Sequence, residues 1–126
     1  MKQMLILIVF SFLLSACAGS NYGVKYPLHN AVYQDDMQKI QELINTGTPT
    51  NTRDNAGMTP IHIAATKKTT DLAAFLLSKG VDVNSLDAYG STPILIAAEY
   101  CSAALMKLFI ENKAQTNLSN DAGNTI

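Results

Sequence analysis

Beyond residue 26, short apolar stretches alternate with polar turns, and this pattern repeats every 33 residues. One apolar pair recurs at that spacing: Leu43-Ile44, Leu76-Leu77 and Phe109-Ile110. Within each unit the apolar positions follow helical spacing over two short stretches, which predicts two short helices per unit. The sequence therefore predicts three helix pairs, near residues 27–46, 60–79 and 93–112.

A polar turn precedes the second and third pairs. The segment Asp54-Asn55-Ala56-Gly57-Met58-Thr59-Pro60-Ile61 returns as Asp87-Ala88-Tyr89-Gly90-Ser91-Thr92-Pro93-Ile94, and in part at residues 120–126 with Gly123 in the same place. We expect the turn glycines to require positive φ. Thr59 and Thr92 are expected to cap helices whose first residues are Pro60 and Pro93, where the missing N–H costs nothing.

The second helix of the middle unit is expected from Asp71 to Ser78. It should bury Leu72, Phe75 and Leu76, and end near Gly80, a residue that tolerates the left-handed conformation. A single helix pair cannot bury its apolar stripe alone, so neighbouring units must stack. The fold class expected is an all-α repeat solenoid.

Two motifs are similar to those of ankyrin-repeat proteins. Thr59-Pro60-Ile61-His62-Ile63-Ala64-Ala65 resembles the signature Thr-Pro-Leu-His-x-Ala-Ala, and residues 75–84 resemble the ending Leu-Leu-Leu-x-x-Gly-Ala-Asp-Val-Asn. The resemblance covers about residues 27–126. It implies short β-hairpin-like fingers before the helix pairs, with repeats at 27–53, 54–86 and 87–119 and a partial repeat at 120–126.

The resemblance also implies roles for single positions. His29 and His62 share one register, at which the family's histidine forms hydrogen bonds between repeats; Leu95 takes that place in the third pair. Three residues replace the usual glycine between the paired helices, and we expect strained turns there: Asp35, Lys68 and Cys101.

The last helix pair is expected to leave an apolar face with only residues 113–126 to cover it. That face comprises Leu105, Met106, Leu108, Phe109 and Ile110. We expect this end of the array to fray or to be completed by a partner.

The N-terminus carries a separate apolar segment. Lys2 precedes an apolar run of 11 residues, 4–14, broken only by Ser11. A helix of this length spans about half of a ~30 Å hydrocarbon core, so it cannot form a stable anchor across it. A basic start, a short apolar run and small residues after it are typical of a secretory signal.

The small residues Leu14-Ser15-Ala16-Cys17 resemble the lipobox of bacterial lipoproteins. The resemblance implies a diacylglycerol group on the Cys17 thiol and cleavage before it. Residues 1–16 are then a signal peptide, and residues 17–26 a lipidated N-terminus with a flexible tether. Ala18 implies the periplasmic face of the outer membrane in a Gram-negative host. An ordinary cleaved signal and an uncleaved N-terminal helix are the alternatives.

The composition of the chain excludes some classes of function. The 126 residues, 15% charged and 48% apolar, allow one small domain and exclude a multidomain enzyme. After residue 16, eight basic side chains face ten acidic ones without a basic cluster, so a nucleic-acid partner is not expected. With Cys17 lipidated, Cys101 has no disulfide partner within the domain. We expect it to be a small, half-buried apolar side chain; an intermolecular disulfide or a reactive thiol is the alternative.

Catalytic chemistry is not expected. Both histidines stand in a repeating structural register, and Asp54 and Asp87 recur as acceptors of the finger turn. The sequence has no phosphate-binding glycine loop, paired-cysteine metal motif or nucleophile turn. We therefore expect no enzyme activity, no cofactor, no metal and no small-molecule substrate.

Binding is the function that a solenoid favours, since finger tips and first helices form a concave surface. Family registers place these partner-binding candidates on that surface: Tyr33, Gln34, Arg53, Asn55, Ala56, Met58, Thr66, Lys67, Leu86, Ala88, Tyr89, Ser91, Glu99 and Tyr100, with Ser119, Asp121, Ala122 and Asn124 of the third finger. Tyr33, Tyr89 and Tyr100 are the best anchors, because tyrosine buries a large area with few rotors.

Several roles suit such a surface on a membrane-tethered chain. The leading hypothesis is a lipoprotein that holds or inhibits a periplasmic or secreted protein; small exported ankyrin lipoproteins resemble immunity proteins that neutralise toxic effectors such as lipases. A second version assists a periplasmic enzyme such as catalase in peroxide resistance. The competing class is a structural or shortened envelope lipoprotein without a tight partner.

Overall fold

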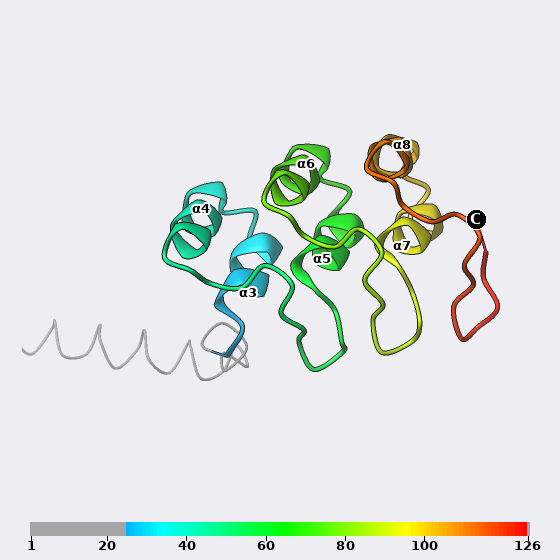
Figure 1. Ribbon diagram of the computed structural model, residues 1–126, viewed down its shortest axis with the longest axis horizontal. Coiled ribbons are helices and arrows are strands. Elements are labelled where there is room, and N and C mark those ends of the chain that lie inside the picture. The colour runs from blue at the N-terminus through cyan, green and yellow to red at the C-terminus, as the bar shows by residue number, and fades with distance from the viewer. Residues whose placement is uncertain (1–24, 126) are drawn as a thin grey trace, which may run out of the picture.

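The structure is a computed structural model that describes residues 25–125. This part of the chain contains helices and no strands (Figure 1). The helices are α3 (Pro27–Tyr33), α4 (Met37–Asn45), α5 (Pro60–Lys67), α6 (Thr70–Ser78), α7 (Pro93–Glu99) and α8 (Ala103–Glu111). They confirm the three predicted pairs, while the signal peptide, Cys17 and most of the tether lie outside the described residues.

The six helices stand in two rows. Helices α3, α5 and α7 form one row, in which α5 contacts both of its neighbours, and α4, α6 and α8 form the other (Figure 1). Each helix pairs with the next along the chain, and the long loops between pairs project beyond the row of α3, α5 and α7 as fingers. The arrangement is an all-helical repeat solenoid, as the 33-residue period predicted.

Local sequence explains where the first helices begin. Pro60 and Pro93 occupy the first turns of α5 and α7. The Thr92 hydroxyl accepts the Leu95 N–H at 3.5 Å, so Thr92 caps α7 as expected. At α5 the side chain of His62, three residues after the cap, also takes part, because its ring accepts the Thr59 N–H at 3.1 Å. The polar position three residues into α5 therefore completes its first turn.

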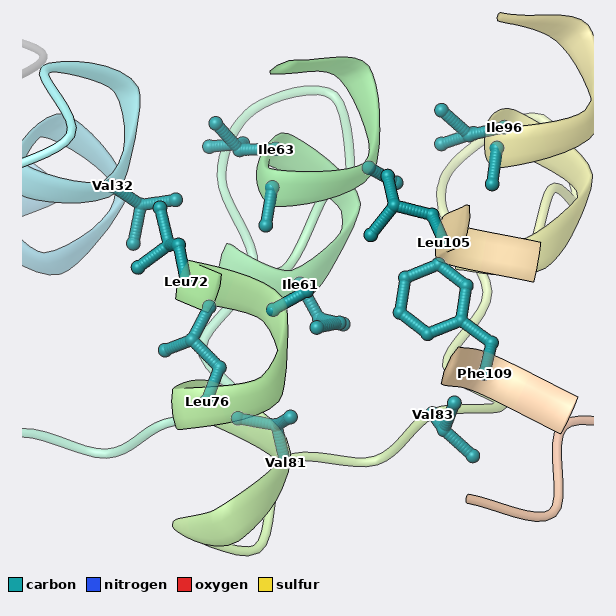
Figure 2. Packing of buried hydrophobic residues seen from close by; sticks show 14 of the residues in the cluster. Val32, Ile61, Ile63, Leu72, Leu76, Val81, Val83, Ile96, Leu105 and Phe109 are labelled. Atoms are coloured by element: carbon teal, nitrogen blue, oxygen red, sulfur yellow. The ribbon is translucent and has the colours of Figure 1, made fainter. Parts of the chain in front are cut away.

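The core lies between the two rows and between successive repeats. Figure 2 shows Leu72 of α6 directed toward Val32 of α3, and Leu76 of α6 and Ile61 of α5 belong to the same cluster, all fully buried. Small residues on the first helices, such as Ala64, are also fully buried and let the helices approach closely. Phe75, predicted to be buried, is only partly so and packs at the edge of this core.

Helix α8 corrects one expectation. Leu105 and Phe109 are both 0% exposed, because they face back toward the preceding repeat, where Figure 2 places Phe109 beside Val83. Met106, by contrast, is half-buried and Ile110 is 51% exposed. Residues four apart share a helix face, so the two pairs lie on different faces. The five apolar residues therefore do not form a single uncovered face.

The turns between paired helices adopt the left-handed conformation. We expected strain there because other residues replace the glycine that the family usually has at these positions. The φ angles of Asp35, Lys68 and Cys101 are 59°, 58° and 54°. Non-glycine residues are strained there by about 1–2 kcal/mol. The expectation of a half-buried Cys101 is wrong, since the tight turn directs this side chain outward and leaves it exposed as a free thiol.

Candidate functional site

Each finger is a tight turn held by one acidic or amide side chain at its start. Asp87 Oδ1 accepts the N–H groups of Tyr89 at 2.8 Å and Ser91 at 2.9 Å. Asn120 Oδ1 accepts those of Ala122 and Asn124 in the same way, at 3.1 and 2.9 Å. These bonds satisfy backbone donors inside the turn and fix the shape of the finger tip.

Neighbouring fingers are joined through their backbones. The Ala88 N–H donates to the Ala56 carbonyl, and the Asp121 N–H donates to the Tyr89 carbonyl, both at 3.0 Å. Gly57, with φ +69°, lies so close to the second finger that a Cβ there would come within 2.6 Å of Ala88 N. The fingers therefore form a continuous wall along one side of the helices.

Buried histidines connect the first helices to the next finger, as the resemblance implied. His62 Nδ1 accepts the Thr59 N–H, so Nε2 carries the proton and donates to the Ser91 carbonyl at 3.0 Å. His29 makes the matching bond to the Met58 carbonyl at 2.8 Å. Burial, the largest influence, lowers the pKa of His62 from its ordinary value of 6.5, because the charged ring is poorly solvated.

The third repeat attaches its finger by different residues. Leu95 replaces the histidine and is buried without a polar side chain. Glu99 Oε1 instead accepts the side-chain amides of Asn120 and Asn124, at 3.4 and 3.2 Å. Asn120 Nδ2 also donates to the Ser91 hydroxyl at 3.1 Å. We did not foresee this link, although an asparagine where the other turns have aspartate supplies the amide donor that makes it possible.

An open groove of about 560 Å³ lies between these fingers and the first helices. Its lining is drawn from α5, from α7 and its end, from the second and third fingers, and from Met58 at the end of the first finger. The lining residues are Met58, Thr66, Asp87, Tyr89, Ser91, Ile96, Glu99, Tyr100, Asn120, Asp121, Ala122 and Asn124. Tyr89 is 68% exposed and Tyr100 46%.

The groove brings together part of the predicted contact set. Met58, Thr66, Tyr89, Ser91, Glu99 and Tyr100 line it, with Asp121, Ala122 and Asn124 of the third finger. Ser91 is buried at its base. We assigned Asp87 only to its turn and did not identify Ile96 of α7 or Asn120, whose side chain is bonded to Glu99 of α7.

The remaining predicted contact residues lie outside the groove, and most of them contact other parts of the chain. Arg53 donates to the Leu86 carbonyl. Asn55 Oδ1 accepts the Tyr26 hydroxyl at 2.7 Å and Lys25 Nζ at 3.3 Å.

Lys67 Nζ donates to the Tyr33 carbonyl and lies 5.3 Å from the centre of the Tyr33 ring. Tyr33 is itself 65% exposed on the first pair, and Gln34, next to it, is exposed as well.

Within residues 25–125, no group of three or more His, Cys, Asp or Glu side chains is placed to hold a metal ion. In the same part of the chain, none of the helices has the length and apolar character needed to span a membrane. The chemistry of the groove is thus that of carboxylates, amides, tyrosine hydroxyls and an apolar base.

Sequence comparison identifies the family of the chain. A family model described as "Ankyrin repeats (3 copies)" matches residues 8–87 and, in a second match, residues 28–120. The curated proteins include no match. The matched residues cover most of the chain and all six helices of residues 25–125, and the repeats suit protein–protein interaction. The chain therefore belongs to the ankyrin-repeat family.

Proposed function

We propose that this chain binds a protein partner in the groove formed by α5, α7 and the second and third fingers, while a lipid on Cys17 holds it at a membrane. The observation that carries the binding proposal is the groove itself, with Tyr89 and Tyr100 both exposed at it. Exposed tyrosines around a recessed surface are typical hot spots of protein interfaces.

The scaffold supports such a role because it presents these side chains on fixed positions. The finger turns are closed by Asp87 and Asn120, and Glu99 ties the third finger to α7. A surface that is already ordered loses little conformational entropy when a partner docks on it. The groove is thus suited to a partner that inserts a short segment between the fingers and the first helices.

The membrane tether rests on the N-terminal sequence. The Leu14-Ser15-Ala16-Cys17 motif follows a short apolar run, and Ala18 follows the cysteine. Two or three acyl chains, each methylene contributing ~0.8 kcal/mol, would hold the chain firmly without a membrane-spanning helix. We propose the periplasmic face of the outer membrane as its site, where a partner would be a periplasmic or secreted protein.

Affinity capture from the native cells tests the binding proposal. The full-length tagged protein, extracted in mild detergent, should bring down one protein in near-equal amount. The double variant Tyr89→Ala/Tyr100→Ala should retain less than about a tenth of it, since hot-spot residues each contribute about 2 kcal/mol or more. Tyr33→Ala is the matched control, because Tyr33 is equally exposed but lies outside the groove.

Equal capture by the wild type and the double variant would contradict the proposal, as would the absence of any stoichiometric partner, which would favour a structural lipoprotein. The identity of the partner separates the remaining roles. A secreted hydrolase such as a lipase, inhibited on binding, would make this an immunity protein. A catalase, together with peroxide sensitivity after deletion of the gene, would make it an accessory protein.

A further inference from the structure

The groove has one sign of charge. Asp87, Glu99 and Asp121 contribute its ionisable carboxylates, and no lysine or arginine is among its lining residues. Within residues 25–125 the ion pairs lie elsewhere, on α4 and α8, so none of these three carboxylates forms an ion pair with a basic side chain of this part of the chain. A positively charged group is therefore the one that the groove attracts.

The walls of the groove restrict what kind of cation fits. Met58 and Ile96 contribute apolar side chains to its lining, and Tyr89 and Tyr100 contribute two exposed aromatic rings. A strongly hydrated ammonium group gains less from such walls than a planar guanidinium, which is weakly hydrated and stacks on aromatic faces. The combination of carboxylates with aromatic rings thus favours arginine over lysine.

Two of the carboxylates, those of Glu99 and Asp121, lie against the second and third fingers. Glu99 Oε1 accepts both amides of the third finger, which fixes the side chain at the rim of the groove. Asp121 Oδ1 lies 2.9 Å from the position that a Cβ on Gly90 would occupy, so it packs against the second finger. A carboxylate has about four acceptor sites, so each retains capacity for further N–H donors.

We propose that the groove binds an arginine side chain in an extended segment of the partner protein, with Glu99 and Asp121 accepting from the guanidinium and Tyr89 and Tyr100 flanking it. This inference rests on the proposed function, and it adds the chemistry of the contact. A groove of about 560 Å³ has room for the arginine and parts of its neighbouring residues.

Peptide display tests the inference and does not require the partner to be identified first. A random library of dodecapeptides is selected against the full-length protein in detergent micelles. We expect the enriched peptides to share one arginine, and replacement of that arginine by citrulline, which keeps the shape but not the charge, to weaken binding about tenfold or more. Replacement by lysine should weaken it less than citrulline does.

The matching protein variant is Glu99→Gln/Asp121→Asn, which removes two charges and keeps oxygen atoms that can accept the bonds of the fingers. It should lose about tenfold or more in affinity for the arginine peptides and no longer prefer them over the citrulline forms. Glu42→Gln is the control, since Glu42 lies on α4 away from the groove. Unchanged far-UV circular dichroism would show that both variants remain folded.

Three results would overturn the inference: no enrichment of peptides, enrichment without a shared arginine, or equal affinity of the double charge variant. Its failure can be told apart from that of the proposed function. If Tyr89→Ala/Tyr100→Ala releases the captured partner while Glu99→Gln/Asp121→Asn keeps it, the groove binds a partner that does not need an arginine. If both variants keep it, the groove is not the binding site.

Discussion

Protonation of His62 should weaken the fold in mild acid. Burial lowers the pKa of this histidine below 6.5, so the unfolded chain takes up a proton at a pH where the folded chain does not. Stability is therefore complete above about pH 6.5, falls as the pH drops through that value, and levels off once the folded ring is also protonated. The slope for one proton is at most about 1.4 kcal/mol per pH unit.

The chain offers its own control, because Leu95 occupies the same register in the third repeat and is buried. His62→Leu removes the titrating group while it keeps an apolar side chain of similar size. It also deletes the bond to the Ser91 carbonyl and the acceptor for the Thr59 N–H. At about 1 kcal/mol for each net hydrogen bond, we expect the variant to be about 2 kcal/mol less stable at neutral pH.

Urea unfolding followed by far-UV circular dichroism, at several values between about pH 5 and pH 8, measures both effects. The difference in unfolding free energy between the wild type and His62→Leu should be largest at neutral pH and should shrink toward about pH 5. A constant difference across this range would refute the argument that His62 enters the fold unprotonated. Equal stabilities at neutral pH would refute the energetic value of the two bonds.

Further predictions concern the fingers, the helix turns and the anchor. Gly57→Ala should destabilise the fold by about 1–3 kcal/mol in the same urea assay, because φ is positive and the new Cβ would meet Ala88 N at 2.6 Å; an unchanged midpoint would contradict the close approach. Lys68→Gly should stabilise by about 0.5–1 kcal/mol, since it relieves a φ of 58°, and a lower midpoint would count against strain there. Cys17→Ser should move the protein out of the membrane fraction, and unaltered fractionation would refute lipidation.

The repeat spacing was sufficient to predict the helix pairs, and the resemblance to ankyrin repeats added the histidine bonds between repeats. In a stacked array, equivalent positions 33 residues apart have equivalent neighbours. The structural role of a residue in one repeat therefore predicts the role of the matching residue in the next repeat. This is why the positive φ of Gly57 and Gly90, the caps at Thr59 and Thr92, and the bond from His62 to the next finger could all be expected.

What the spacing could not predict depends on the direction of individual side chains. An apolar stretch such as residues 103–111 does not show which residues face the preceding repeat, and Leu105 and Phe109 proved to be the inward pair. Likewise, the positions that vary between repeats predicted Arg53 and Lys67 as contact residues, yet both bond to carbonyls within the chain. A long side chain can contact a neighbouring repeat, and the position of a residue within its own repeat does not show whether it does so.

These internal contacts differ between the first finger and the two fingers at the groove. On the first finger, Asn55 is already bonded to Tyr26 and Lys25, and at the end of α5 Lys67 turns toward Tyr33. The basic residues of this side are thus engaged near the first repeat.

The second and third fingers instead bond mainly to themselves, to neighbouring fingers and to α7, and they leave Tyr89, Asp87 and Asp121 at the groove beside Glu99 and Tyr100 of α7 and its end. Lys25 and Lys67 therefore make their contacts near α3, while the carboxylates of the groove lie near α7. A partner segment with a basic residue is expected to dock with that residue near α7, and its opposite end toward α3.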